Sequence, residues 1–329
     1  MNWNKKTVLI TGAGGFIGSH LTERLVNLGA TVKAFVRYNS RNNWGLLELL
    51  SKEKLNEIEV ILGDLKDSDA IRRITKDVDM IFHLGALIAI PYSYISPRET
   101  IETNIMGTFN IMTAAKENQV GKVIHTSTSE VYGTARYVPI DENHPLQGQS
   151  PYSASKIGAD KITESFFYSY DLPVTIIRPF NTYGPRQSAR AIVPTIITQA
   201  LTQNKIYLGS TYPTRDLTYI TDTIRGFIKI AESPKSIGET INIGSNYEIS
   251  IDELAKKITE MINPKIKIIT TTQRIRPKRS EVERLFVDNS KAKKLLNWKP
   301  KVNLNNGLKK TIDWISKNIE LYKPEMYVV

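Results

Sequence analysis

The stretch Thr7-Val8-Leu9-Ile10-Thr11-Gly12-Ala13-Gly14-Gly15-Phe16-Ile17-Gly18 decides the fold of this 329-residue chain. Its apolar start predicts a short strand, its glycines predict a turn, and the amphipathic segment Ser19–Leu28 predicts a helix that stops near Gly29. Glycines at positions 12, 15 and 18 allow the backbone to approach a pyrophosphate closely, and the start of the helix attracts negative charge. The same pattern in isolation also fits a turn without a ligand, so its meaning depends on the segments around it.

Strands and helices alternate after this stretch, which predicts an α/β fold of the Rossmann type with a doubly wound parallel sheet. In that architecture, catalytic groups gather at the carboxyl ends of the strands, around the crevice where a cofactor binds. Gly63-Asp64, His83–Ala86 and Ser127–Glu130 each follow a predicted strand, so we expect them to line one groove. The expected strands are Thr31–Val36, Glu59–Leu62, Met80–Leu84, Lys122–Thr126 and Val174–Arg178, and the expected helices are Trp44–Leu50, Asp67–Thr75, Pro97–Glu117 and Tyr152–Tyr170.

The pattern changes at Pro179–Arg186, where two prolines and a glycine predict a loop that leaves the sheet. The chain is also long for a single compact core. We therefore expect two domains. A cofactor-binding domain would comprise residues 1–179 and about 217–244, and a smaller, interleaved C-terminal α/β substrate domain would comprise residues 180–216 and 245–329.

The composition is that of a globular protein with excess positive charge, 44 Lys and Arg against 33 Asp and Glu, for a net charge of +11. The charge is scattered apart from a denser part at Arg274–Arg284, which favours a small anionic substrate over a nucleic-acid partner. The lack of cysteine excludes disulfides, and the histidines show no metal-ligand spacing. Because no apolar run is long enough to cross a membrane and no signal peptide is recognisable, we expect a cytoplasmic protein without metal or membrane association.

The candidate catalytic residues are a hydroxyl-rich segment, Ser127-Thr128-Ser129-Glu130, and a tyrosine–lysine pair, Tyr152 and Lys156. The tyrosine and the lysine lie four residues apart on a predicted helix and therefore share a face. We expect the lysine cation to lower the pKa of the tyrosine from its usual value of about 10, so that the phenol can accept a proton from an alcohol near neutral pH. Glu130 supplies a second base. Each piece alone is common on protein surfaces, and only the context makes them a site.

The residues after the second strand bear on the choice of dinucleotide. An acid at this place usually holds the adenosine ribose of NAD. Here the segment reads Arg37-Tyr38-Asn39-Ser40-Arg41, and arginine with serine suits the 2′-phosphate of NADP. A solvated basic loop is the alternative.

Further motifs recur along the chain: Gly12-x-x-Gly15-x-x-Gly18, Gly63-Asp64-Leu65, His83-Leu84-Gly85-Ala86, Asn104-x-x-Gly107-Thr108, Ser127–Gly133, Tyr152-x-x-x-Lys156, Arg178-Pro179-Phe180-Asn181, Arg215-Asp216 and Asp288-x-Ser290-Lys291-Ala292. Together they resemble the extended short-chain dehydrogenase/reductase superfamily, in particular its NAD(P)-dependent sugar-nucleotide epimerase/dehydratase branch. The resemblance covers most of the chain, and it is more specific for the superfamily than for the reaction.

The resemblance implies a role for each candidate residue. Tyr152 would remove the proton of the sugar 4-hydroxyl, Lys156 would hold the nicotinamide ribose, and Thr128 would bond the sugar hydroxyl. It also implies a tightly bound NAD(P) that is regenerated in each turnover. The expected cofactor-binding residues are Gly12, Gly15, Phe16, Ile17, Gly18, Arg37, Ser40, Arg41, Asp64 at the adenine, Leu65, Leu84, Ala86, Tyr152 and Lys156.

Thr128-Ser129-Glu130 resembles the signature of 4,6-dehydratases of the GDP-mannose type. In these enzymes the glutamate takes the C5 proton of the 4-keto sugar, water leaves from C6, and the hydride returns to C6. The dTDP-glucose dehydratases carry an aspartate where this chain has Ser129. Either Glu130 or a water held by Ser129 would therefore protonate the departing hydroxyl.

Several alternatives stay open at this point. The same three residues occur in UDP-glucuronate decarboxylases, the second candidate, and a 4-epimerase is the third. Gln187–Pro194 looks like the corresponding part of amino-sugar dehydratases of nonulosonic-acid pathways, which favours UDP- or GDP-N-acetylglucosamine as substrate. The resemblance also implies a homodimer through Pro97–Glu117 and Tyr152–Tyr170. The expected substrate-binding residues are Tyr92, Asn181, Arg186, Arg215, Arg276 and Glu281.

Overall fold

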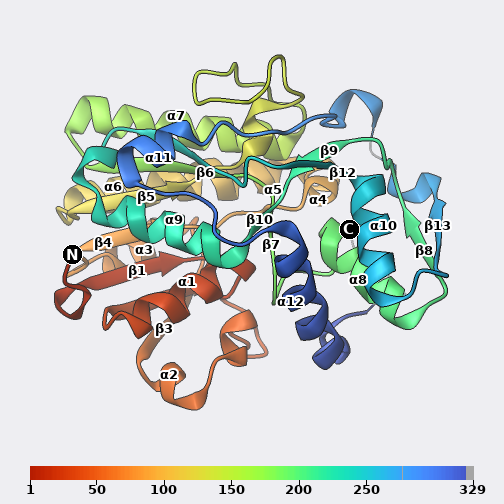
Figure 1. Ribbon diagram of the computed structural model, residues 1–329. Helices are drawn as coiled ribbons and strands as arrows, with labels where there is room; N and C mark the ends of the chain where they lie inside the picture. Colours follow the sequence, from red (N-terminus) through yellow and green to blue (C-terminus); the bar gives the residue numbers. More distant parts are fainter. Residues whose placement is uncertain (276, 324–329) are drawn as a thin grey trace.

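The computed structural model describes residues 1–275 and 277–323 of the chain. Its centre is a parallel sheet in the order β11-β6-β5-β4-β1-β2-β3 (Figure 1). This is the doubly wound fold that the sequence predicts. The strands are β1 (Thr7–Thr11), β2 (Thr31–Arg37), β3 (Ile58–Gly63), β4 (Met80–His83), β5 (Lys122–Thr126), β6 (Val174–Pro179) and β11 (Thr240–Ile243).

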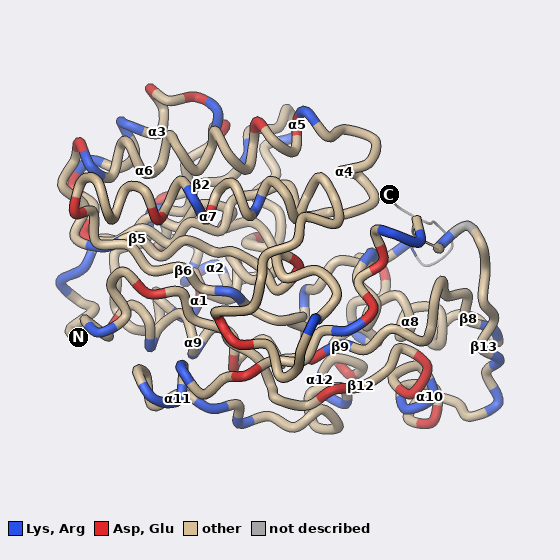
Figure 2. Tube along the Cα trace, turned by 90° about the horizontal axis from the view of Figure 1, so that it is seen from above, with Lys and Arg blue, Asp and Glu red and all other residues tan. Residues whose placement is uncertain are grey.

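Helices cover both faces of the sheet, so its inner strands are apolar on both sides. Strands β4 and β6 are buried at every position. Figure 2 shows helices α3 and α6 on one side of the strands and helices α9 and α11 on the other. The helices of the first layer are α3 (Ser68–Ile74), α6 (Gly107–Glu117) and α7 (Pro151–Tyr170), and those of the second are α1 (Phe16–Asn27), α9 (Ile220–Glu232) and α11 (Ser290–Leu296).

The direction of strand addition reverses between β1 and β4, which are neighbours in the sheet. Such a reversal opens a crevice at the carboxyl ends of the two strands. The glycine turn after β1 comes very close to the turn after β4: a Cβ on Gly12, whose φ is +70°, would lie 2.8 Å from the Gly85 nitrogen. Only glycine allows the two turns to meet this closely.

The predicted helix Pro97–Glu117 is not a single α-helix. It consists of α5 (Pro97–Ile101), a π-helical turn at Glu102–Met106, and α6. Asn104 lies in the π turn, and its side chain accepts from the Leu87 N–H and donates to the Ser155 hydroxyl. The wider turn thus places one side chain between the loop after β4 and the start of α7, an arrangement typical of π turns near functional sites.

Two further expectations need correction. Trp44–Leu50 forms a 3₁₀-helix at Gly45–Leu49, followed by the short helix α2 (Lys52–Asn56). Helix α1 begins at Phe16, three residues before the predicted start, because its first turn belongs to the glycine motif itself. A short helix, α4 (Ile90–Ile95), also follows β4.

A second region is formed by the elements between β6 and α9 and by those after β11. It packs helices on short strand pairs beside the main sheet (Figure 1). The chain then returns to the sheet through α9 and β11, which gives the interleaving expected from the sequence, whereas the domain boundaries themselves stay a prediction. Helix α11, in the predicted substrate range, packs on β11. The elements of the second region are α8 (Ile192–Thr202), α10 (Ile251–Ile262), α12 (Leu304–Lys317), β8 (Lys205–Leu208) with β13 (Lys267–Thr270), and β9 (Thr214–Asp216) with β12 (Glu248–Ser250).

Candidate active site

The carboxyl ends of β1 and β4 are joined by hydrogen bonds below the crevice. The Thr11 hydroxyl lies 2.8 Å from Nδ1 of His83 and accepts from the Gly85 N–H at 3.0 Å. The other ring nitrogen of His83 lies 3.0 Å from the Thr108 hydroxyl. Burial lowers the pKa of His83 well below its usual value, so the imidazole is neutral near pH 7. His83 therefore links β1, β4 and α6 at the base of the crevice as a neutral side chain.

The glycine turn fits a dinucleotide pyrophosphate. Gly15 is the N-cap of α1 and no side chain caps this helix, so the backbone N–H groups of its first turn remain available to an anion. A Cβ on Gly18 would lie 2.1 Å from the Gly12 carbonyl oxygen, which shows how closely this helix packs on the turn. Phe16 and Ile17, also predicted to bind the cofactor, begin α1. These features are the cradle that a bound pyrophosphate needs.

Other predicted cofactor residues surround the same crevice. Asp64 directly follows β3, and its carboxylate accepts from the Lys66 N–H at 2.9 Å. Leu65 is buried against the glycines of two neighbouring segments, Gly85 and Gly107. Leu84 and Ala86 follow β4 and are half-buried. The structure thus brings the predicted residues after β1, β3 and β4 together at one edge of the sheet.

The basic segment after β2 is exposed at the surface. Arg37, Ser40 and Arg41 are all exposed, and the Arg37 guanidinium lies 3.3 Å from the Glu99 carboxylate. The Tyr92 hydroxyl donates to the same carboxylate. Tyr92, predicted to bind substrate, therefore shares a carboxylate partner with Arg37, while Tyr94 of the same helix bonds to Ser280, next to the predicted substrate residue Glu281.

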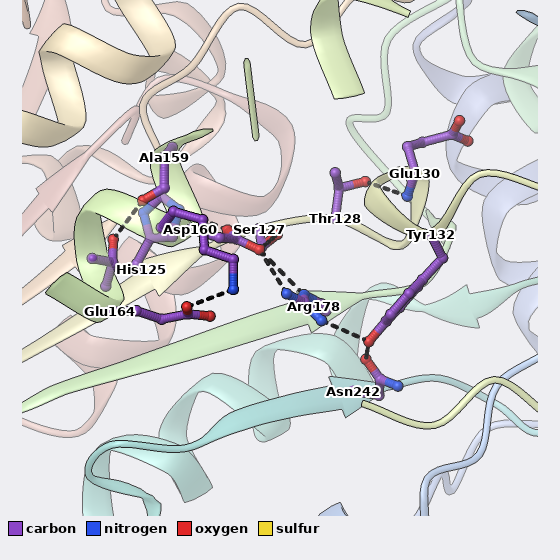
Figure 3. Close-up of polar contacts among 12 residues, drawn as sticks. His125, Ser127, Thr128, Glu130, Tyr132, Ala159, Asp160, Glu164, Arg178 and Asn242 are labelled. Carbon is purple, nitrogen blue, oxygen red and sulfur yellow. Dashed lines mark hydrogen bonds and ion pairs between the residues drawn. The ribbon is translucent and has the colours of Figure 1, made fainter. Parts of the chain in front are cut away.

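The loop Ser127–Tyr132, called the catalytic loop because it carries the candidate residues Thr128, Ser129 and Glu130, begins where β5 ends. Thr128 is the N-cap of a 3₁₀-helix, Ser129–Tyr132, and its hydroxyl accepts from the Glu130 N–H at 3.2 Å. This bond orients the backbone of Glu130, whose carboxylate points away from the Arg178 side (Figure 3). Ser129 and Glu130 are both buried, at 2% and 9% exposure. The loop is thus an ordered turn and not a solvated hydroxyl run.

Tyr152 and Lys156 lie in the first turns of α7, and both are buried. The helix starts with Pro151 in its first turn and with a reciprocal capping box between Ser150 and Ser153, two features that stabilise a helix start. Burial lowers the pKa of Lys156 to about 8, and the nearby Asp160 charge opposes this shift. The lysine therefore keeps its proton at neutral pH but loses it under mildly alkaline conditions.

The expected direction of the tyrosine pKa is wrong for this structure. Burial raises the pKa of Tyr152 above its usual value, an interaction with the Thr128 hydroxyl lowers it, and the charges of Glu130 and Asp160 raise it. Desolvation outweighs the favourable contacts because the phenol is enclosed. The effect of Glu130 also shows that its carboxylate lies within electrostatic reach of the phenol.

A buried polar cluster that the sequence analysis did not anticipate lies beneath the loop (Figure 3). At its centre, the Asp160 carboxylate accepts from the Ser127 hydroxyl at 2.8 Å and from Arg178 at 2.9 and 3.2 Å. The third guanidinium nitrogen of Arg178, Nη1, donates to the Tyr132 hydroxyl at 3.0 Å, and that hydroxyl donates to Asn242 at 2.7 Å. The available signal was a carboxylate one helical turn after Lys156.

At the substrate end, two predicted residues from distant segments meet. Arg215 and Glu281 are buried, and their charged groups lie 3.4 Å apart. The Glu281 carbonyl accepts from the Thr134 hydroxyl, and that hydroxyl accepts from the Glu283 N–H at 3.0 Å. Residues 281–283 are therefore attached to the segment that follows the catalytic loop.

The remaining predicted substrate residues are less closely grouped. The Arg186 guanidinium lies 2.8 Å from Glu23 of α1, and its Nη1 is buried without a hydrogen bond within the described residues, so its substrate role stays a prediction. Asn181 follows β6, and its buried side-chain oxygen makes no hydrogen bond within the part of the chain that the structure describes. Arg276 lies outside the described residues.

The described ranges contain no group of three or more His, Asp or Glu side chains placed to hold a metal ion. They also contain no helix with the length and apolar character required to cross a lipid bilayer. Neither finding bears on the roles of Tyr152, Lys156 and Glu130.

A glycine turn that fits a dinucleotide, with a buried Tyr-x-x-x-Lys pair beside a Thr-Ser-Glu loop, defines an NAD(P)-dependent enzyme of the extended short-chain dehydrogenase/reductase superfamily. Comparison with known proteins narrows the class. The family model described as GDP-mannose 4,6 dehydratase matches residues 9–311, and the chain belongs to this family of nucleotide-sugar enzymes.

Its similar proteins catalyse more than one reaction. Human dTDP-D-glucose 4,6-dehydratase is 32% identical over 97% of this chain and 92% of its own length. UDP-N-acetyl-alpha-D-glucosaminuronate decarboxylase of Bacillus cytotoxicus is 34% identical over 94% of this chain and 98% of its own length. The solved dTDP-glucose 4,6-dehydratase DesIV of Streptomyces venezuelae, which has NAD bound, superposes with a TM-score of 0.84 at 28% identity over 97% of this chain and 100% of that chain. Nucleotide-sugar 4-epimerases are similar as well.

Proposed function

We propose that the protein is a nucleotide-sugar 4,6-dehydratase, which converts a nucleotide-linked hexose to its 4-keto-6-deoxy derivative. The observation that carries the proposal is the placement of Glu130 on an ordered turn within electrostatic reach of Tyr152. A base beside the phenol is what elimination requires, because the C5 proton must leave after C4 has been oxidised.

The described residues divide the proton transfers between them. Tyr152 removes the proton of the 4-hydroxyl, which requires that the positive charge of a bound nicotinamide lower the phenol pKa that burial raises. Thr128 and Lys156 hold the reacting groups. The glycine turn and the uncapped start of α1 would hold NAD(P)⁺, which when bound would supply the hydride acceptor for oxidation at C4 and the hydride donor for C6. Glu130 takes the proton from C5, which the adjacent ketone makes acidic, and the C6 hydroxyl leaves as water after gaining a proton. A proton returns to C5, so the substrate loses one water and the dinucleotide ends in its starting state.

The sugar of the substrate is inferred from sequence resemblance. We favour UDP- or GDP-N-acetylglucosamine, because the segment Gln187–Pro194 resembles that of amino-sugar dehydratases. Several similar proteins carry names with such sugars: a UDP-N-acetylglucosaminuronate decarboxylase, an NDP-hexosamine 5,6-dehydratase and a UDP-N-acetylglucosamine 4-epimerase. The decarboxylase is also the relative that keeps the second candidate reaction open.

Incubation with a panel of nucleotide sugars tests the reaction directly. We expect UDP- or GDP-N-acetylglucosamine to lose one water, as measured by mass spectrometry, while UDP-glucuronate, dTDP-glucose and GDP-mannose react more slowly. Loss of carbon dioxide from a uronate would instead establish the decarboxylase. A product of unchanged mass with a new sugar configuration would establish the epimerase.

The role of Glu130 can be isolated by isotope exchange. In Glu130→Gln, C4 oxidation should continue slowly, while solvent-deuterium uptake at C5 and overall turnover should fall by about 10²- to 10⁴-fold, the usual contribution of a general base. The matched control is Tyr152→Phe, which should lose C4 oxidation as well. Deuterium uptake at C5 by Glu130→Gln at the wild-type rate would remove Glu130 from this role.

For the cofactor, we propose NADP, because the exposed side chains of Arg37, Ser40 and Arg41 suit a 2′-phosphate. The Arg37 contact with Glu99 would have to open, and the similar solved structures include one with NAD bound and one of an NAD-dependent enzyme. The dinucleotide choice therefore depends on a direct comparison of affinities.

Calorimetric titration makes this comparison. The wild-type protein should bind NADP⁺ more tightly than NAD⁺, and the double variant Arg37→Ala/Arg41→Ala should weaken NADP⁺ binding by about tenfold or more, since each charge-assisted bond contributes about 1.5–3 kcal/mol. Affinity for NAD⁺ should not change. Arg73→Ala, which removes another exposed arginine, serves as the control. Tighter binding of NAD⁺ by the wild-type protein would refute the NADP assignment.

We also infer a homodimer through the layer that contains α6 and α7. Three large apolar side chains of the α5–α6 segment are exposed: Ile101 at 45%, Met106 at 48% and Phe109 at 39%. Phe109 packs edge-to-face on the buried Phe166 of α7, so this exposed side chain lies where the two helices meet. Several large exposed apolar side chains on one segment are typical of an interface.

Light scattering after size-exclusion chromatography measures the assembly. The wild-type protein should have the mass of two chains, and Met106→Glu should shift it toward one chain, because a charge at the centre of an apolar interface is poorly solvated. Leu49→Glu is the control, since Leu49 is similarly exposed, at 37%, and lies on the 3₁₀-helix that packs against α1, on the other face of the sheet. A monomeric wild-type protein would contradict the inference.

A further inference from the structure

We propose that Asp160 is a positioning residue of this active site, which holds both ends of the catalytic loop from below and balances the buried charge of Lys156. The proposal rests on the proposed function for its kinetic consequences. Its geometric and electrostatic parts concern Asp160 alone, and they can be tested without a substrate.

The geometry begins with the two ends of the loop Ser127–Tyr132. The Ser127 hydroxyl, at the start, donates to Asp160 at 2.8 Å. The Tyr132 hydroxyl, at the end, accepts from Arg178, which donates twice to the same Asp160 oxygen. Thr128 and Glu130 lie between these two attachments. One buried carboxylate–guanidinium pair therefore anchors the segment that carries both groups.

Asp160 also links three elements of the fold. It lies on α7 one helical turn after Lys156, Ser127 follows β5, and Arg178 is in β6. Asp160 and Arg178 are buried at 0% and 3% exposure, so water does not compete for their bonds. The loop and the tyrosine–lysine pair are consequently held in a common register by a single ion pair.

Within the described part of the chain, Asp160 is the anion whose charge raises the pKa of Lys156. The other groups are His83 from β4, His125 from β5, Arg178 from β6, and Tyr152 on α7, with Glu130 above on the loop. Burial lowers the pKa of His125 to about 4, so neither histidine carries charge near pH 7. Without Asp160, the buried cations Lys156 and Arg178 would both lose a nearby anion.

Asp160 itself stays ionised. Burial alone raises its pKa, but the contact with His125, 3.3 Å away, and the Arg178 charge hold the pKa at about 2. Because a nearby anion raises a lysine pKa, its removal lowers the pKa of Lys156 below about 8. Lys156 then loses its proton at a lower pH than in the wild-type protein. Activity that depends on the protonated lysine therefore begins to fall at a lower pH on the alkaline side of the profile.

The test compares Asp160→Asn with three other variants. Asp160→Asn should reduce kcat by about 10²-fold, as expected for a misplaced catalytic loop, with KM changed by less than about threefold. The alkaline limb of the pH profile should move to lower pH. Asp160→Glu, which keeps the charge, should restore that limb, and Ser127→Ala, which removes one attachment only, should lower kcat without moving the limb.

Asp222 provides the matched control. It is 2% exposed, and its carboxylate accepts from two backbone N–H groups and pairs with Arg225 on α9. Asp222→Asn should lower the melting temperature to a similar extent but leave kcat and the pH profile at wild-type values. Equal losses of kcat in the two Asn variants would reduce Asp160 to a stability residue and overturn the proposal.

A second readout does not depend on turnover. The ¹³Cε resonance of Lys156, assigned with Lys156→Arg, reports the lysine pKa in the protein as purified and after addition of NAD(P)⁺. The titration should move to lower pH in Asp160→Asn and stay in place in Ser127→Ala and Asp222→Asn. An unchanged Lys156 titration in Asp160→Asn would overturn the electrostatic part. If the wild-type protein dehydrates no nucleotide sugar, the proposed function fails while this titration still decides the inference.

Discussion

The close approach of Gly12 to Gly85 is the constraint on which the rest of the site depends. It joins the turns after β1 and β4, where the direction of strand addition reverses, and a Cβ at Gly12 would lie 2.8 Å from the Gly85 nitrogen. The Thr11 hydroxyl bonds to the His83 ring and accepts from the Gly85 N–H, and these bonds hold the same two turns from below. The strands are parallel and buried, so the register of β1 with β4 determines where the carboxyl ends of the later strands lie. The catalytic loop starts at one of these ends, after β5.

Burial creates a second constraint, since charged groups enclosed by the fold must be paired. The Asp160–Arg178 pair satisfies it and simultaneously binds both ends of the catalytic loop. Removing one partner of such a pair usually costs about 3–5 kcal/mol, because the other charge stays buried and unpaired. Substitution of either partner therefore reduces the stability of the fold, and the pair fixes the position of the loop that is bonded to it.

The sequence predicted the parts of the fold that depend on local pattern. The parallel strands are apolar runs bounded by turns, and the Tyr152/Lys156 helix begins with Ser150 and Pro151, a recognisable start. What it missed depends on long-range contacts. The π turn at Glu102–Met106 is tied to Leu87 and Ser155, and Arg186 is held by Glu23, 163 residues earlier in the chain. The pKa of Tyr152 was assigned the wrong direction because residue spacing contains the charge of Lys156 but not the burial of the phenol.

The structure also explains why one fold supports dehydratases, decarboxylases and epimerases. In the proposed function, oxidation at C4 uses the dinucleotide cradle and the Tyr152/Lys156 pair, which belong to the main sheet and α7. The step after it is assigned to Glu130, on a separate turn, whereas the predicted nucleotide contacts Arg215 and Glu281 belong to the second region. Since these groups lie on different elements, a substitution in one can alter the reaction without altering the substrate. Ser129 is the position where this separation matters most, because it adjoins Glu130, is buried, and carries no carboxylate of its own. Glu130 is therefore the only carboxylate of the turn Ser129–Tyr132.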